Sequence, residues 1–140
     1  MIYYLSMGAN IGNREAAIRQ AMDMIEQQVG HILRCSAFYY SAPWGFASNN
    51  DFCNICCSVE SVLSPHDLLR TTQSIERALG RTRKSVNGIY HDRTIDIDII
   101  LCFDGQKEIT INTPDLTIPH PLWQERDFVR IPLQEICHGR

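Results

Sequence analysis

The chain has 140 residues, of which 44% are hydrophobic, and its formal net charge is −3 at pH 7. This length predicts a single domain over residues 1–140, with enough apolar residues for one core. The slightly negative net charge argues against a protein dedicated to binding nucleic acid or a membrane surface. The sequence shows neither a signal-peptide pattern nor an apolar run near the roughly 20 residues that span a bilayer, so we expect a cytoplasmic location.

The first half of the chain alternates strand and helix patterns. Residues 2–7 predict a buried strand, and residues 8–13 predict a tight connection that ends on Asn13, a good helix cap. Apolar residues at helical spacing from Ala17 to Val29 predict the first helix, which ends at Gly30. Residues 31–40 and 52–63 predict two further strands, separated by a loop over residues 41–51.

The second half begins with another helix. Ser64 and Pro65 are typical of a helix start, and Gly80 is expected to end this helix. A basic, irregular stretch then leads into a strand over residues 94–103, followed by a hairpin to a short strand over 108–112. The order β-α-β-β-α-β predicts an α+β, ferredoxin-like sandwich, in which an antiparallel sheet carries both helices on one face and leaves the other face for a ligand. The remaining residues form a C-terminal extension of short elements.

Two cysteines have the C-x-x-C spacing that zinc and redox sites use. Cys53 and Cys56 lie in a segment that reads as a strand, however, where residues three apart point to opposite faces. Cys53 and Cys57 instead share a face with Ile55 and Val59. We favour buried structural thiols over metal or redox use.

An acidic pair interrupts the apolar strand over residues 94–103. Asp96 and Asp98 are two positions apart and therefore point to the same face, while Ile95, Ile97 and Ile99 point to the core. Two adjacent carboxylates repel each other and call for a cation, and oxygen ligands of this kind suit magnesium shared with substrate phosphates. The alternative is a solvated strand face with two surface acids.

A cluster of basic residues directly precedes this strand. Five of the thirteen Lys and Arg residues lie between positions 77 and 93. Arginines beside an acidic pair suit a ligand with several phosphates and its metal ions, because guanidinium groups grip phosphate oxygens bidentately. A solvated charge run and a nucleic-acid patch are the alternatives. Phe52 and Asn54 share a strand face and would suit a flat heteroaromatic ligand, although an edge-strand Phe is as common.

Taken together, these motifs resemble the 6-hydroxymethyl-7,8-dihydropterin pyrophosphokinase family of folate biosynthesis. The resemblance runs from the first strand to about Ile136. It is carried by residues 7–12, 38–45, 52–54, 73–76, 80–84, 93–99, 119–121 and 125–129, among which Arg-Thr-Ile-Asp-Ile-Asp-Ile at 93–99 is the most specific.

The resemblance implies a ferredoxin-like fold and transfer of pyrophosphate from ATP to the pterin hydroxymethyl group, with release of AMP. It implies that Asp96 and Asp98 bind two Mg²⁺ ions and, with Arg81 and Arg93, are catalytic. On the ATP side it implies Gln73, Arg83, Tyr90, Arg93, Ile99, Thr117, His120 and Arg126. On the pterin side it implies Ser41, Ala42, Trp44, Phe52, Asn54 and Phe128. The family position of Glu76 is acidic, without an assigned role. We expect a monomer or weak homodimer that binds no nucleic acid and no membrane.

Several residues depart from the family pattern. Leu122-Trp123 and Asp115 stand where the family commonly has a basic residue, and two more departures directly precede Arg93. His91 and Asp92 stand where the family has a small residue and then a proline or a similar residue, and Asp92 adds a negative charge beside the expected triphosphate. They motivate a second hypothesis, a catalytically impaired paralogue that only binds pterin or nucleotide. A third hypothesis is an unrelated ferredoxin-like module that binds nucleic acid, which the net charge disfavours.

Overall fold

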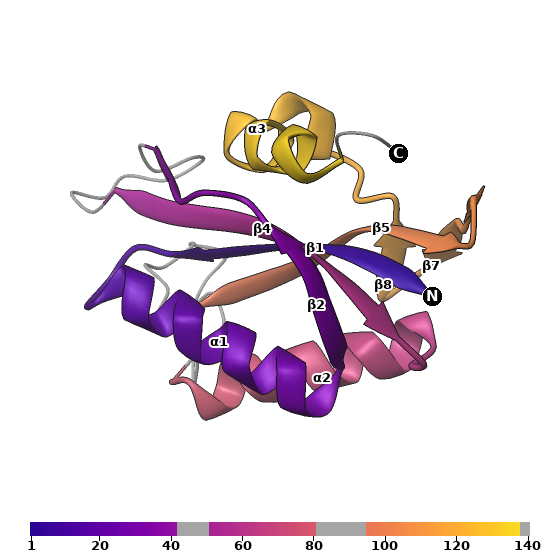
Figure 1. Cartoon of the computed structure of the whole chain (residues 1–140), viewed down its shortest axis with the longest axis horizontal. Coiled ribbons are helices and arrows are strands. Elements are labelled where there is room, and N and C mark those ends of the chain that lie inside the picture. The colour runs from indigo at the N-terminus through magenta and orange to yellow at the C-terminus, as the bar shows by residue number, and fades with distance from the viewer. Residues whose placement is uncertain (42–50, 81–94, 138–140) are drawn as a thin grey trace.

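The computed structural model describes residues 1–41, 51–80 and 95–137 (Figure 1). The elements up to the second helix are β1 (Ile2–Ala9), α1 (Arg14–Gln28), β2 (Gly30–Cys35), β3 (Tyr39–Ser41), β4 (Phe52–Ser61) and α2 (Pro65–Ala78). They are followed by β5 (Asp96–Asp104), β6 (Lys107–Glu108), β7 (Ile111–Thr113), β8 (Leu116–Ile118), the 3-10 helix η1 (Trp123–Glu125) and α3 (Asp127–Ile136). Among the described residues, no helix is both long and apolar enough to cross a membrane.

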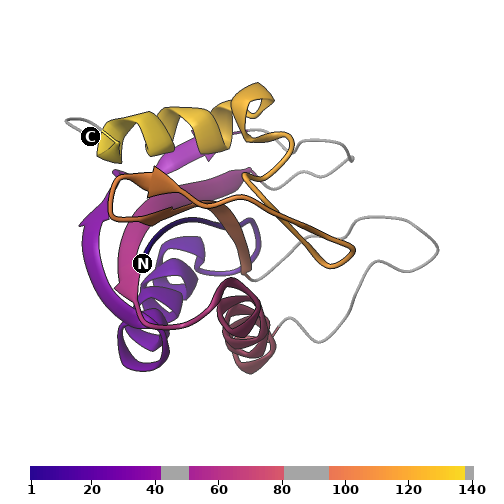
Figure 2. The same ribbon diagram turned by 90° about the vertical axis from the view of Figure 1, so that its right-hand side faces the viewer.

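The main sheet is antiparallel and has the strand order β2-β4-β1-β5-β6, with β3 paired to β4. β1 therefore lies between β4, which carries Phe52 and Asn54, and β5, which carries Asp96, Asp98 and Ile99. α1 and α2 cover the same face of this sheet (Figure 2). This arrangement is that of a ferredoxin-like sandwich, so the predicted fold class is confirmed.

Both helix starts follow from their predicted caps. The Asn13 side chain accepts a hydrogen bond from the backbone N–H of Ala16 at 3.1 Å. Ser64 Oγ accepts one from the backbone N–H of Asp67 at 3.3 Å, and Pro65 begins α2. Each cap satisfies a first-turn N–H that has no partner within its helix.

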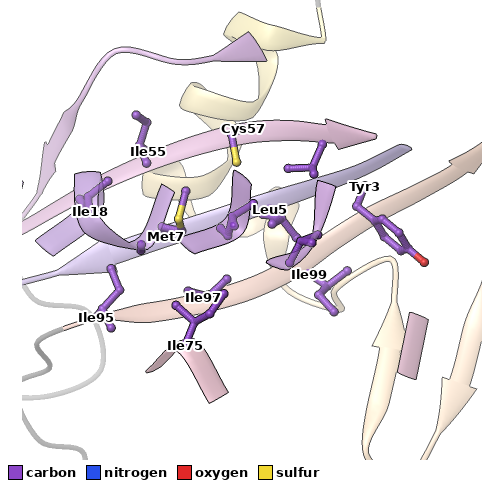
Figure 3. Packing of buried hydrophobic residues seen from close by; sticks show 14 of the residues in the cluster. Tyr3, Leu5, Met7, Ile18, Ile55, Cys57, Ile75, Ile95, Ile97 and Ile99 are labelled. Atoms are coloured by element: carbon purple, nitrogen blue, oxygen red, sulfur yellow. The ribbon is translucent and has the colours of Figure 1, made fainter. Parts of the chain in front are cut away.

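The main core lies between the sheet and these two helices. Alternate residues of the central strands point into it, and Figure 3 shows Leu5 and Met7 of β1 among Ile55, Ile97 and side chains from the helices. The predicted cysteine face is confirmed, because Cys53, Cys57 and their apolar neighbours on β4 belong to this core. Cys56 lies in the cluster on the other face, so strand geometry separates the two thiols of the C-x-x-C motif.

The C-terminal extension forms a helix on the second face of the sheet (Figure 2). Val129, Leu133 and Ile136 of α3 pack with Tyr4, Cys56, Ile100 and Leu101. The Cys56 thiol donates to the Val129 carbonyl across this contact at 3.6 Å. The sequence predicts a helix-free face, whereas the structure covers part of it with α3 at Tyr4, Cys56, Ile100 and Leu101.

A β-bulge lets β5 serve both faces. The pairing between β1 and β5 shifts between Tyr4 and Leu5, so that Tyr4 lies opposite Leu101 while Leu5 lies opposite Ile99. The extra residue is Ile100, which joins Leu101 in the cluster under α3. The Ile100 carbonyl accepts a hydrogen bond from the backbone N–H of His120 at 3.0 Å. The bulge therefore fixes a predicted ligand-binding histidine beside β5.

Several segments differ from their predicted structure, among them the predicted strand over residues 108–112, which is divided between β6, ending at Glu108, and β7, beginning at Ile111. Gly8 and Ala9 continue β1 instead of turning, and they pair with Asn54 and Cys53 of β4. The predicted strand over residues 31–40 is divided into β2 and β3 around Ser36, whose hydroxyl accepts the Cys56 N–H at 3.0 Å. This side-chain contact replaces a regular ladder bond, and β3 then pairs with the first residues of β4.

Candidate active site

A single row of residues crosses the three central strands on the face opposite α1 and α2. Gly8 of β1 lies opposite Asn54 of β4 on one side and opposite Asp96 of β5 on the other. Residues that face each other in a sheet point to the same side, and neighbouring strands are about 5 Å apart, so Asn54 and Asp96 lie on one surface about 10 Å from each other. This row brings the predicted pterin-binding amide next to the predicted metal-binding carboxylate.

The glycine in this row is required by the amide beside it. A Cβ atom on Gly8 would lie 2.2 Å from Asn54 Oδ1 and 3.2 Å from its Cγ. The Asn54 side chain therefore occupies the space above Gly8 and points across β1. The sequence predicts a tight connection at residues 8–13, whereas in the structure Gly8 lies within β1 and directly contacts the Asn54 amide.

The second carboxylate lies in the next row on the same face. Asp98 lies opposite Ser6, which in turn lies opposite Cys56. Asp96 and Asp98 are both half-buried, whereas Ile95, Ile97 and Ile99 are buried in the core between the sheet and the helices. The predicted division of β5 into an acidic face and an apolar face is therefore present.

Two buried polar atoms at the amide end of the site have no hydrogen-bond partner in the part of the chain that the structure describes. They are Asn54 Nδ2 and Ser41 Oγ. Ser41 pairs with Phe52 across β3 and β4, and Asn54 pairs with Tyr39, so both atoms belong to adjacent positions on these strands. An unsatisfied buried polar atom costs about 1–3 kcal/mol, which a ligand with donors and acceptors on its ring edge would recover.

Predicted residues of the C-terminal extension lie along the border of α3. Arg126 precedes α3, and its guanidinium carbon is 5.9 Å from the centre of the Phe128 ring. Burial, with a smaller contribution from the positive charge of Arg126, lowers the pKa of His120 below its ordinary value of 6.5, while Asp96 acts in the opposite direction. His120, Arg126 and Asp96 are therefore electrostatic neighbours.

The side chain of His120 has a defined orientation. Its Nδ1 lies 3.4 Å from the backbone N–H of Leu122, from which it accepts a hydrogen bond. A neutral imidazole that accepts at Nδ1 carries its proton at Nε2. The ring can therefore donate a hydrogen bond to an anion.

The remaining predicted residues within the described ranges are peripheral to this row. Gln73 is exposed on α2, and Thr117 is exposed on β8. Thr117 belongs to the hairpin of β7 and β8, which His66 links to α2. His66 Nε2 lies 3.1 Å from Thr113 Oγ1 and 3.3 Å from Asp115 Oδ1. The Ile99 side chain is buried in the core on the other face, so Asp96 and Asp98 do not share their surface with it.

Comparison with known proteins accounts for the combination of the Asn54 amide and the Asp96 and Asp98 carboxylates on one face of the sheet. The model of the 7,8-dihydro-6-hydroxymethylpterin-pyrophosphokinase (HPPK) family matches residues 4–138. The chain belongs to the HPPK family. The resemblance that its motifs indicate is thereby confirmed, and the match includes both Asp residues of β5, Asn54 and the whole of α3.

Relatives from several organisms share most of the chain. A 2-amino-4-hydroxy-6-hydroxymethyldihydropteridine pyrophosphokinase of Porphyromonas gingivalis is 47% identical over 97% of this chain and 90% of its own length. One of Bacillus subtilis is 39% identical over 97% of this chain and 78% of its own length. A folic acid synthesis protein of Dictyostelium discoideum is 41% identical over 97% of this chain, which corresponds to 20% of that protein.

A solved structure supports the fold. The crystal structure of an HPPK-DHPS in complex with substrates superimposes with a TM-score of 0.69 over 96% of this chain and 40% of that chain, at 15% identity. At this identity the likeness concerns the fold alone.

Several sequence predictions fall outside the described residues. They concern Ala42, Trp44, Arg81, Arg83, Tyr90 and Arg93, together with the departures from the HPPK pattern at His91 and Asp92. The structure instead draws attention to two residues without a predicted role, Gly8 and Glu76. The burial of Glu76 has a signal in the sequence, because it follows Leu68 and Thr72 at intervals of four and therefore continues the buried stripe of α2.

Proposed function

We propose that this member of the HPPK family transfers diphosphate from ATP to the hydroxymethyl group of 6-hydroxymethyl-7,8-dihydropterin and releases AMP, as a step of folate biosynthesis. The observation that carries the proposal is the row of Asn54, Gly8 and Asp96, in which an amide with unused hydrogen-bonding capacity lies about two strand spacings from a carboxylate pair. The proposed location is the cytoplasm, and the proposed state is a monomer or weak homodimer.

The proposed pterin half of the site is formed by β3, β4 and the start of α3. Asn54 and Ser41 would hydrogen-bond the polar edge of the ring, and Phe52 and Phe128 would contact its faces. Phe52 lies two positions from Asn54 on the same face of β4, and Phe128 is half-buried at the start of α3. Ala42 and Trp44 are proposed as further pterin contacts on the basis of the family resemblance.

The proposed metal site consists of Asp96 and Asp98. In the described residues no group of three His, Cys, Asp or Glu side chains gathers as a complete metal cage. Two carboxylates on one strand face fit Mg²⁺, which commonly takes one or two protein carboxylates and completes its shell with substrate phosphates and water. When bound, two Mg²⁺ ions would neutralise charge on the triphosphate and favour deprotonation of the attacking hydroxyl.

The proposed ATP half adjoins this pair. His120 would donate its Nε2 proton to a phosphate oxygen, and Arg126 would contribute a positive charge beside it, as their proximity to Asp96 supports. Gln73, Thr117 and Ile99 are proposed as further ATP contacts, with Ile99 acting through its backbone. Arg81, Arg83, Tyr90 and Arg93 are assigned to ATP or to the transition state by family resemblance, and guanidinium groups there would stabilise developing phosphate charge.

Product analysis tests this function. The purified protein is incubated with ATP, Mg²⁺ and 6-hydroxymethyl-7,8-dihydropterin, and nucleotides are separated by chromatography. We expect AMP to form in equal amount with the pterin consumed, and to be absent without pterin or with excess EDTA. Formation of ADP would indicate transfer of a single phosphoryl group. Pterin binding without AMP formation would indicate the impaired paralogue.

A further inference from the structure

Glu76 is a buried acid on the inner side of α2. Its exposed fraction is 5%, and it lies next to Ile75, a core residue. Burying a carboxylate is unfavourable unless it accepts good hydrogen bonds. Glu76 Oε2 accepts one from the backbone N–H of Ile97 at 2.7 Å, across 21 positions of sequence.

The donor of this bond lies between the two carboxylates of the proposed metal site. Ile97 separates Asp96 from Asp98 and points its own side chain into the core, near Ile75 (Figure 3). Successive N–H groups of a strand point to opposite edges, so the N–H groups of Asp96 and Asp98 point toward β1 when that of Ile97 points away from it. In the described residues, β6 pairs with Phe103 and Asp104 only, and this edge of β5 at Ile97 is occupied by the Glu76 carboxylate.

From this geometry we infer that Glu76 is a positioning residue for the pair Asp96 and Asp98. Its hydrogen bond holds the backbone of β5 at the one residue that both carboxylates adjoin, and so fixes the direction in which they leave the strand. Residues that orient metal ligands without touching the metal commonly have large effects on metal affinity. The inference rests on the proposed function only for the identity of what the pair binds.

A purely structural role makes a different prediction. If Glu76 only filled the space between α2 and β5, its replacement would lower the stability of the fold without changing the affinity of the folded protein for a divalent cation. Glu76→Gln retains a side-chain oxygen that can accept the Ile97 N–H, whereas Glu76→Met keeps a similar volume and removes the acceptor. Thr72→Val is a matched control, because Thr72 is equally buried on α2 and its hydroxyl bonds to Leu69 of the same helix.

The experiment measures two quantities that do not depend on turnover. Hydrogen exchange of the Ile97 amide is followed by NMR in the ligand-free protein, and Mn²⁺ affinity is measured by EPR in the absence of nucleotide. We expect Glu76→Met to lose protection of Ile97 and to weaken Mn²⁺ binding by about 10- to 100-fold. We expect Glu76→Gln and Thr72→Val to retain both properties.

Two results would overturn the inference. One is unchanged Mn²⁺ affinity in folded Glu76→Met. The other is equal weakening in Glu76→Gln and Glu76→Met while the Gln variant still protects the Ile97 amide. Absence of AMP formation by the unmodified protein would contradict the proposed function and leave both measurements interpretable. With an active protein, kcat of Glu76→Met should fall while the KM for pterin stays near its original value.

Discussion

Replacing Asp98 by alanine should lower kcat by on the order of 10³-fold, the scale of losing a preorganised electrostatic element in an active site. Asp96→Ala should have a similar effect. Both carboxylates lie on one face of β5, so removal of either leaves half of the proposed metal site. Pterin binding should change much less, since Asn54 and Ser41 lie on the other side of β1. Steady-state kinetics and calorimetry of pterin binding measure the two effects.

Asp104→Ala is the matched control for these variants. Asp104 is the last residue of the same strand and is exposed, and it lies on the far side of the bulge at Ile100. Its replacement should leave kcat unchanged. The free energy of unfolding of all three variants should stay within about 1 kcal/mol of the original, because none removes a core side chain. An Asp98→Ala protein that folds and turns over at the original rate would exclude the proposed metal site.

Gly8→Ala should weaken pterin binding by about 10- to 100-fold, equivalent to about 1–3 kcal/mol of lost hydrogen bonding. The new Cβ would lie 2.2 Å from Asn54 Oδ1, so the amide must move. Because the clash involves the end of a side chain and not the backbone, the sheet should still form. Titration calorimetry with the pterin measures the change, and thermal unfolding checks the fold.

A double-mutant cycle assigns this effect to the amide. In an Asn54→Ala background, the side chain that Gly8→Ala displaces is absent, so the glycine substitution should cost little further affinity. ATP binding should be affected less than pterin binding in each variant. If Gly8→Ala weakened pterin binding equally with and without Asn54, the contact between these two residues would not explain the need for glycine.

Much of the site follows from strand periodicity. The alternation of residues along β4 predicts that Phe52 and Asn54 share a face, and that along β5 predicts the same for Asp96 and Asp98. The structure confirms that the two residues of each pair share a face. The predicted element order also places β1 between β4 and β5 once a ferredoxin-like sandwich is adopted. Local pattern and topology together therefore predict which side chains gather on one surface.

Register is what the local pattern leaves undetermined. That Gly8, and not a neighbour, lies between Asn54 and Asp96 depends on pairings across about 50 and 90 positions of sequence, which periodicity within one strand does not encode. The bulge at Ile100 is a similar case. It places Ile100 and Leu101 on one face and provides the carbonyl that binds the His120 backbone, although the sequence there reads as an uninterrupted apolar strand.

In the C-terminal helix, a proline obscures the helical spacing of the apolar residues. Val129, Leu133 and Ile136 have helical spacing and form the buried side of α3, but Pro132 within this stretch favours a broken structure. In α3 Pro132 is buried at the sixth position, and the helix continues to Ile136. The prolines around η1 and α3 therefore led to a prediction of short elements where the chain forms a helix that borders the site.

The most direct test of the central claim is the distance between the bound pterin and the metal site. The protein is saturated with a non-hydrolysable ATP analogue, Mn²⁺ and 6-hydroxymethyl-7,8-dihydropterin, and the line widths of the pterin hydroxymethyl protons are recorded by NMR against a Mg²⁺ reference. We predict strong paramagnetic broadening that is lost when Asp96 and Asp98 are both replaced by asparagine. Unbroadened hydroxymethyl lines, with both the pterin and Mn²⁺ shown to be bound, would contradict the account.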